Sequence, residues 1–430
     1  MTTPPLLRAL SHRNFRLFFY GQGLSLIGTW ITRVATSWLV YRLTGSALLL
    51  GVVGFAGQIP NFVLSPLAGV MADRWNLRRV LVVTQVLSML QSFALAALAL
   101  SHVITVPHVI ALSIFQGIVN AFDTPARQAF AVEMVEGARD LPNAIAINSM
   151  MFNAARLVGP MVAGIIIAAA GEGICFLLDG VSYIAVIACL LAMHVNIAAP
   201  RRASSNVWQG LREGVRYIVG FEPIRGLLLL VSAASLLGMS YVVLLPMFAR
   251  EILHGGAHTY GFLASASGMG ALAGAMYLAS RSSVRGLGRV IAWGGVLFGA
   301  ALAAFAFCHT TWLSMVMLFA AGFGMMVQNA SANTILQTIV HDDKRGRVMS
   351  FYALAVLGMA PFGSLLAGSV AAKVGAPWTI FGGGAACIIA ALLFLRRLPV
   401  IRTLVRPIYV QKGIIPEVAS GIQGASSAND

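Results

Sequence analysis

Long apolar runs recur from near the beginning of this chain almost to its end, and they limit the folds that it can adopt. A run of about twenty apolar residues is what an α-helix needs to cross a hydrocarbon layer roughly 30 Å thick. Hydrophobic residues make up 58% of the 430 positions, and only 10% are Asp, Glu, Lys or Arg. A soluble globular domain carries about 25% charged residues. The chain is therefore predicted to be an all-α integral membrane protein.

We place twelve transmembrane helices along the sequence. The first six are predicted at residues 15–41, 47–71, 80–100, 106–127, 143–170 and 174–195. The last six are predicted at residues 225–250, 259–280, 289–309, 312–337, 347–373 and 377–396. A polar break separates the two sets, and within it apolar residues recur at helical spacing beside arginines. This pattern predicts an amphipathic helix on the membrane surface.

The predicted organisation follows from these spans. It consists of an N-terminal six-helix bundle at 1–195, a cytoplasmic linker at 196–224, a C-terminal six-helix bundle at 225–398 and a cytoplasmic tail at 399–430. The end of the tail is rich in Gly, Ser and Ala and is expected to be disordered.

The distribution of basic residues predicts the orientation in the membrane. If the N-terminus is cytoplasmic, 24 of the 29 Lys and Arg fall in cytoplasmic segments and three fall outside. The positive-inside rule then puts both termini in the cytoplasm. The same rule accounts for the net charge of +15, so nucleic acid is not predicted as a partner. We expect a multi-pass protein of a bacterial inner (plasma) membrane.

Motifs of soluble enzymes are missing from the sequence. There is no phosphate-binding loop and no His/Cys cluster with metal-ligand spacing. Four cysteines lie inside apolar runs without paired spacing, which is typical of packing residues. The chain is therefore not predicted to be an enzyme, to hydrolyse ATP, or to bind a metal or cofactor.

Polar side chains within the spans are the candidates for function, since each costs energy in lipid and tends to face a cavity or a partner. Several recur every three or four residues, which places them on one face of their helix. The candidates for lining a cavity are Gln22, Gln58, Asn61, Asn120, Asn329, Asn333 and Gln337. Hydrogen bonding between helices, without any contact to a substrate, is an equally open interpretation.

Four charged residues within the spans are candidates for carrying protons or charge: Arg33, Asp123, Arg156 and Asp179. Asp123 is the first of them, because a carboxylate in a low-dielectric cavity is able to take up a proton. An open alternative for Arg33 is a purely structural role, in which it pairs with Asp123 or Asp179 only to neutralise a buried charge. Arg127, near the end of its span, is interpreted as extending to the membrane interface.

The loop between the second and third spans carries Gly69, Asp73, Arg74, Arg78 and Arg79. This spacing resembles the signature loop between helices two and three of major facilitator transporters. In that superfamily the loop acts as a conformational latch between the cytoplasmic faces of the two halves. The resemblance implies the same role for these five residues.

The fifth span holds a second pattern, with Gly159, Pro160 and Gly164. It looks like the exporter-associated motif Gly-x-x-x-Gly-Pro-x-x-Gly-Gly, with alanine at positions 155 and 163. Small residues there permit close helix packing, and proline permits a kink. In the superfamily this motif marks antiporters, so the resemblance implies efflux. Residues 11–16 further resemble the subgroup of enterobactin exporters and macrolide efflux proteins.

The resemblance implies the major facilitator fold, in which two pseudo-repeated six-helix bundles hold the substrate near the midplane between them. Residues 117–135 align with 322–340 without a gap, at equivalent places in the two halves. The resemblance to the superfamily also implies a monomeric, proton-driven exporter that works by rocker-switch alternating access. Its substrate would be a hydrophobic or amphipathic small molecule, such as a drug or siderophore. Two alternatives stay open. One is a nutrient importer or facilitator, against which the Gly159-Pro160 motif argues. The other is a non-transporting membrane sensor, against which the polar stripes argue.

Overall fold

The computed structural model describes residues 5–72, 75–134, 140–193, 207–281 and 283–414. Within these ranges the regular structure is helical, and eleven helices are long and apolar enough to cross a membrane. A twelfth long helix, α1 (Arg13–Thr44), spans 32 residues, and its interior is more polar because it contains Arg16 and Arg33. At 1.5 Å per residue α1 is about 48 Å long, which is ample for a membrane. The predicted all-α membrane architecture is confirmed.

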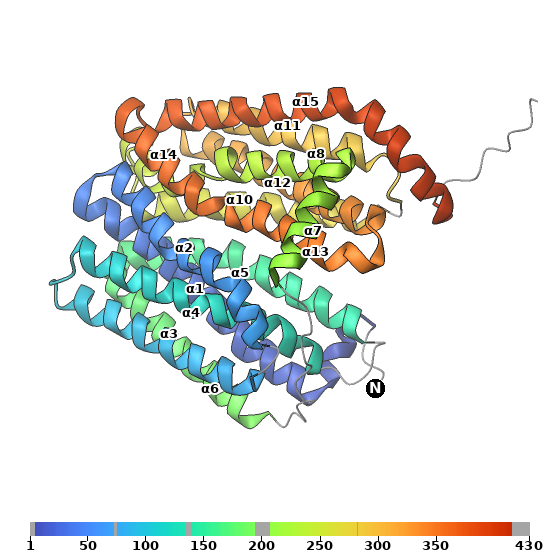
Figure 1. Ribbon diagram of the computed structural model, residues 1–430. Coiled ribbons are helices and arrows are strands. Elements are labelled where there is room, and N and C mark those ends of the chain that lie inside the picture. Colours follow the sequence, from blue (N-terminus) through green and yellow to red (C-terminus); the bar gives the residue numbers. More distant parts are fainter. Residues whose placement is uncertain (1–4, 73–74, 135–139, 194–206, 282, 415–430) are drawn as a thin grey trace, which may run out of the picture.

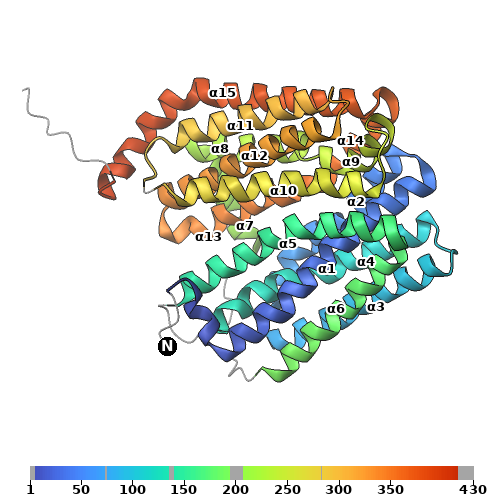
Figure 2. The ribbon, with the colours of Figure 1, turned by 180° about the vertical axis from the view of Figure 1, so that it is seen from behind.

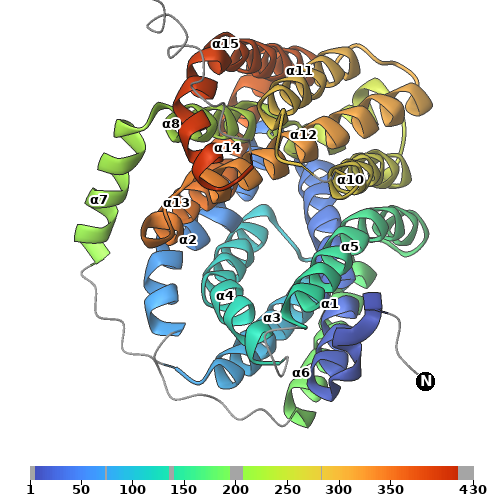
Figure 3. The same ribbon diagram turned by 90° about the vertical axis from the view of Figure 1, so that its right-hand side faces the viewer.

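The first half of the chain forms one bundle, drawn in blue to green in Figure 1. After a 3₁₀ turn, η1 (Pro5–Ser11), its helices are α1, α2 (Ala47–Ala72), α3 (Leu77–Leu100), α4 (Val106–Glu133), α5 (Leu141–Ala170) and α6 (Glu172–Ala192). Helix α1 packs against α5 and α6, and α3 packs against α4 and α6. A separate short helix, α7 (Val207–Gly220), follows this bundle and crosses the flank of the second half (Figure 3).

The second half forms the other bundle (Figures 1 and 2). Its helical segments are α8 (Glu222–Ala233), η2 (Ala234–Gly238), α9 (Tyr241–Met247), η3 (Phe248–Ile252), α10 (Ala257–Ala279), α11 (Leu287–Phe305), α12 (Thr311–Ile339), α13 (Asp342–Ala353), η4 (Leu354–Gly358), α14 (Ala360–Val374) and α15 (Ala376–Gln411). The segments from α8 to η3 form one continuous span, and those from α13 to α14 form another. The π turns η2, η3 and η4 interrupt these spans, which the apolar pattern alone did not predict.

Short loops join antiparallel helices at two ends of the molecule. We call the end that carries residue 5 and residue 414 the termini end, and the other the opposite end (Figure 1). Gly45, at φ 59°, closes α1 at the opposite end by donating its N–H to the carbonyl of Tyr41. A positive φ of this kind favours glycine, because it has no Cβ.

Two helix pairs make the most extensive contacts between the halves: α5 with α10 and α2 with α14. Glycines allow the backbones to touch at both crossings. A Cβ on Gly261 would lie 2.4 Å from the Pro160 carbonyl oxygen, and one on Gly368 would lie 2.8 Å from the Cα of Gly51. These contacts fall toward the opposite end, where the two bundles converge in Figure 1. The structure is therefore a state in which the opposite end is closed.

The last helix is longer than predicted. Helix α15 runs to Gln411, whereas the sequence pattern ended the last span at residue 396 and the second bundle at 398. Pro399 and Pro407 lie inside the helix. A proline removes one backbone hydrogen bond and normally weakens a helix. Ile401 and Val405 continue the buried face, and this packing against the second half carries the helix past both prolines.

Candidate functional site

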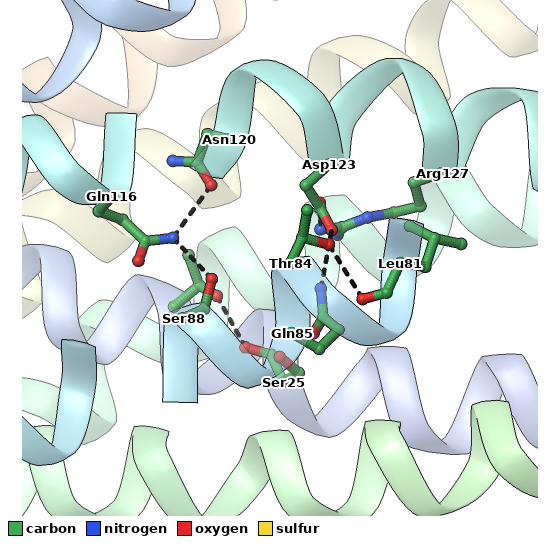
Figure 4. A network of polar contacts seen from close by, with 10 residues as sticks. Ser25, Leu81, Thr84, Gln85, Ser88, Gln116, Asn120, Asp123 and Arg127 are labelled. Carbon is green, nitrogen blue, oxygen red and sulfur yellow. Dashed lines mark hydrogen bonds and ion pairs between the residues drawn. The ribbon is translucent and has the colours of Figure 1, made fainter. Parts of the chain in front are cut away.

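The first bundle contains a buried network centred on Asp123 of α4 (Figure 4). Its carboxylate forms an ion pair with Arg127, one turn further along α4. Thr84 and Gln85 of α3 donate hydrogen bonds of 2.9 and 2.8 Å to Asp123 Oδ1. With only 3% of its surface exposed, Asp123 is a fully compensated anion held between two helices of the same half.

The network continues along α3 and α4. Gln116 donates to Ser88 Oγ at 3.0 Å and to the side-chain oxygen of Asn120 at 3.1 Å. Ser25 of α1 lies beside Ser88 (Figure 4). The predicted stripe of polar residues on α4 therefore faces α3, with hydrogen bonds both to that helix and along α4 itself.

The row of polar residues on α3 is a part of the site that the sequence interpretation missed. Thr84, Ser88 and Ser92 are spaced by four residues and are all at most 5% exposed. This spacing puts them on one face of the helix, and it is visible in the sequence. Ser and Thr are mild in hydropathy, so they did not stand out within an apolar run.

Among the residues that the structure describes, no cation pairs with the second buried carboxylate, Asp179 of α6. Thr32 of α1 and Ser92 of α3 each donate a hydrogen bond of 2.8 Å to its Oδ2. Its Oδ1 is buried and has no hydrogen-bond partner in the described part of the chain. Gly28 of α1 makes room for this oxygen, because a Cβ there would lie 2.6 Å from it. Asp179 is thus held by neutral donors alone and is 1% exposed.

Two expected roles for arginines are wrong. Arg33 pairs with neither Asp123 nor Asp179, since those carboxylates bind Arg127, Thr32 and Ser92 among the described residues. Arg127 does not extend to the membrane interface but turns into the first bundle. The reason is that an i, i+4 spacing on α4 already brings Arg127 to Asp123.

Arg33 of α1 and Arg156 of α5 instead lie close enough to repel each other. Each has a tyrosine of the second half nearby, Tyr260 for Arg33 and Tyr241 for Arg156. Neither arginine forms an ion pair with any acid in the described part of the chain. The structure thus brings these two predicted residues together at the boundary between the halves.

Aromatic side chains surround Arg33. Its guanidinium lies 4.7 Å from the centre of the Trp30 ring, a typical cation–π arrangement. Trp30 meets Phe152 of α5 edge-on, with ring centres 6.1 Å apart. The Phe152 side chain is 47% exposed, so it borders open space.

The predicted cavity-lining amides have mixed surroundings. Gln58 is exposed and donates to the carbonyl of Gly54, while Asn61 accepts a hydrogen bond from Ser65. Gln22 is 4% exposed and borders no open space in this state. On α12, Gln337 donates to Asn333 at 2.7 Å, and the Asn329 side-chain oxygen is buried without a partner.

The two glycines of the motif in α5 face different helices. A Cβ on Gly159 would lie 2.4 Å from the Trp30 Cβ in α1, whereas one on Gly164 would lie 2.8 Å from the Ala257 carbonyl oxygen in α10. Pro160 contributes its carbonyl to the same crossing with α10. The motif therefore lies where α5 contacts both its own half and the other half.

Only part of the predicted latch can be located. Asp73 and Arg74 lie outside the described residues, and Gly69 lies in the last turns of α2. Arg78 donates to the carbonyls of Leu190 and Leu191 at the end of α6, at 2.8 and 2.7 Å.

Side chains also connect the halves at the opposite end. The Tyr41 hydroxyl of α1 donates to Glu251 of η3. Trp38 stacks on Tyr260 with ring centres 6.3 Å apart. Together with the glycine crossings, these contacts seal this end of the boundary.

A surface pocket of about 350 Å³ lies between α7 and α13, lined among others by Arg216, Tyr217, Lys344 and Arg347. None of the polar residues described above lines it.

Two helical bundles that meet at glycine crossings, with charged residues buried among their spans, have the architecture of a membrane transporter. A family profile described as transmembrane secretion effector matches residues 5–407. The chain belongs to this family of the major facilitator superfamily, which confirms the resemblance seen in the sequence.

Individual relatives agree with this assignment. The chain is 26% identical to the staphyloferrin A transporter of Staphylococcus aureus over 386 residues, covering 89% of this chain and 96% of the relative. It is 28% identical to the multidrug efflux pump Tap of Mycolicibacterium fortuitum over 357 residues, covering 81% and 87%. A crystal structure of a peptide transporter of the POT type superposes with a TM-score of 0.73 at 12% identity, covering 91% of this chain and 95% of that one. The last likeness concerns the fold alone.

Proposed function

We propose that this transporter exports a hydrophobic or amphipathic small molecule, siderophore-like or drug-like, in exchange for protons. The relatives named as a staphyloferrin A transporter and a multidrug efflux pump support a substrate of this kind. The motif at Gly159 and Pro160, typical of antiporters in the superfamily, supports export. Protons are the partner ion, and the protein acts as a monomer.

The observation that carries the proton coupling is the state of Asp179. Adding a proton to its unpartnered Oδ1 breaks no ion pair and removes an uncompensated charge from the membrane interior. Asp123 differs, because protonating it would leave Arg127 without its counter-charge. Asp179 is therefore the proton carrier in our proposal, and Asp123 with Arg127 holds α3 and α4 together.

Alternating access follows from the two helix crossings. In our proposal the protein lies in the plasma membrane. The closed opposite end faces the outside of the cell, and the termini end faces the cytoplasm. The excess of Lys and Arg in the loops of the termini end supports this orientation. Movement of α2 and α5 against α14 and α10 would then open the outer side, with the Asp73 loop acting as latch.

The proposal is tested in inside-out vesicles that are energised to an acidic interior. A pH-sensitive dye follows the interior while cationic drugs, macrolides and catecholate siderophores are added one at a time. A transported substrate should raise the interior pH in vesicles with the wild-type protein. Asp179→Asn should abolish this response while keeping substrate counterflow, because exchange of one substrate molecule for another needs no proton.

The matched control is Arg402→Gln, an exposed residue of α15 far from the carboxylates. It should behave like the wild type. Proton release that persists in Asp179→Asn would contradict the assigned carrier. If the wild-type protein is inserted in the membrane and no compound changes the interior pH, export of these three classes of compound would be contradicted.

A further inference from the structure

We propose that Arg33 and Arg156 form an anion-binding site between the halves and that the transported molecule carries at least one carboxylate. This inference rests on the proposed function only in taking the boundary between the halves as the substrate path. It names the charge of the substrate, which the sequence pattern left open.

The position of both arginines is suited to a substrate site. Arg156 is the sixteenth of the 30 residues of α5 and so lies at the middle of that helix. Arg33 lies 11 residues before the end of α1, about 16 Å from it along the helix axis. Both groups are therefore deep within the membrane-spanning region.

Both arginines also border open space. Arg33 is exposed and Arg156 is half-buried, so both residues reach accessible space. Tyr260 beside Arg33 and Tyr241 beside Arg156 belong to the second half, so this space lies between the halves.

The charges of this pair are not compensated. In the described part of the chain the intramembrane acids have other partners: Asp123 binds Arg127, and Asp179 accepts from Thr32 and Ser92. Two uncompensated cations within membrane spans are costly, and such groups are retained there chiefly for function. An anion between the two guanidinium groups would relieve this cost.

The chemistry of the site favours a carboxylate attached to an apolar or aromatic body. A guanidinium matches a carboxylate with two parallel hydrogen bonds. The Trp30 ring under Arg33 and the exposed face of Phe152 supply an aromatic wall next to the cations. An amphipathic dicarboxylate would engage both arginines and this wall together.

The test uses three probes of similar size that differ in charge: benzylsuccinate, its dimethyl ester and benzyltrimethylammonium. Binding to the full-length protein in lipid nanodiscs is measured by isothermal titration calorimetry. Benzylsuccinate should bind, and the ester and the cation should bind at least tenfold more weakly. Arg33→Gln and Arg156→Gln should each weaken the binding of benzylsuccinate about 10- to 100-fold, which is the range for losing a charged hydrogen-bond partner.

Three further variants make the result specific. Arg402→Gln removes the same charge from an exposed position on α15 and should leave binding unchanged. Arg33→Lys and Arg156→Lys keep the charge but not the paired hydrogen bonds, and should bind benzylsuccinate more weakly than the wild type and more tightly than the Gln variants. These variants also separate loss of the site from loss of folding.

Equal binding of the ester or the cation, or unchanged binding in both Gln variants, would overturn the inference. The vesicle assay distinguishes this from failure of the proposed function. Proton-coupled export of cationic drugs without carboxylate binding would refute the anion site and keep the exporter. Carboxylate binding that needs both arginines, without any export, would keep the anion site and refute the exporter.

Discussion

The glycine crossing between α5 and α10 allows a sharp test of how the opposite end is closed. A Cβ on Gly261 would lie 2.4 Å from the carbonyl oxygen of Pro160, where an ordinary contact needs at least 3.4 Å. The obstructing atom is backbone, so no side chain can turn aside. Gly261→Ala therefore forces the two helices about 1 Å apart, given that such contacts do not shorten.

The expected size of the effect follows from overpacking. Inserting a methyl group into a close-packed contact costs about 1–3 kcal/mol. The strain exists only while α5 and α10 touch at the opposite end, so the cost falls on the closed state. The ratio of open to closed protein should rise about 5- to 150-fold, the factor that corresponds to this free energy.

Distances between spin labels measure that ratio. We would attach one label at Val103 in the first half and another at Thr310 in the second, both exposed at the opposite end, after replacing the four native cysteines. Gly261→Ala should lengthen the distance between the labels and should slow transport.

A matched control is Gly382→Ala in α15, where nothing lies within 4 Å of the added Cβ. Its label distances should equal those of the parent. Gly164→Ala approaches the same crossing from α5, at 2.8 Å from the Ala257 carbonyl oxygen, and should open the end as well. Unchanged distances in both crossing variants, with the protein still folded, would refute the idea that glycine contact closes this end.

Three other perturbations follow from the polar contacts. Asp123→Asn should lower the free energy of unfolding by about 3–5 kcal/mol, because it leaves a buried cation unpaired. Adding Arg127→Gln should restore part of this loss. An unaltered melting temperature in the single variant would contradict the ion pair. Tyr41→Phe should destabilise the closed state by about 1.5 kcal/mol, the low end for a hydrogen bond to a charged group, since Glu251 is exposed. The same spin labels check it, and an unchanged distance would count against that contact as part of the seal. In Gly28→Ala the added Cβ would lie 2.6 Å from the buried carboxylate of Asp179. The substitution should therefore lower the free energy of unfolding by about 1–3 kcal/mol and impair proton release in vesicles. Normal proton release would argue against this tight fit.

The comparison of spans shows which parts of the fold are local. Each transmembrane helix is predicted by the length and hydropathy of its own residues, and these do not depend on the rest of the chain. The π turns in the span Glu222–Ile252 and the extension of α15 to Gln411 were missed. The extension of α15 depends on packing against neighbouring helices, which the local pattern does not contain.

The same distinction between local sequence and tertiary packing applies to the candidate site. The stripe on α4 could be predicted, because Asp123 and Arg127 are four residues apart and face the same way. The partners of Asp179 could not, since Thr32 and Ser92 are 147 and 87 positions away in the sequence. A carboxylate in a hydrophobic run signals that some partner exists, and only the packing of α1 and α3 against α6 selects it.

By itself, then, the sequence determined the membrane class, the long helices and the family, because hydropathy and short motifs are properties of neighbouring residues. The tertiary structure decided which charges are compensated. Arg33 and Arg156, 123 positions apart, come together without an acid among the described residues, whereas Asp123 pairs with Arg127 and Asp179 accepts hydrogen bonds only from neutral donors. The physical reason is that the energy of a buried charge depends on what lies within a few ångströms of it, and in a helical bundle those neighbours come from other helices.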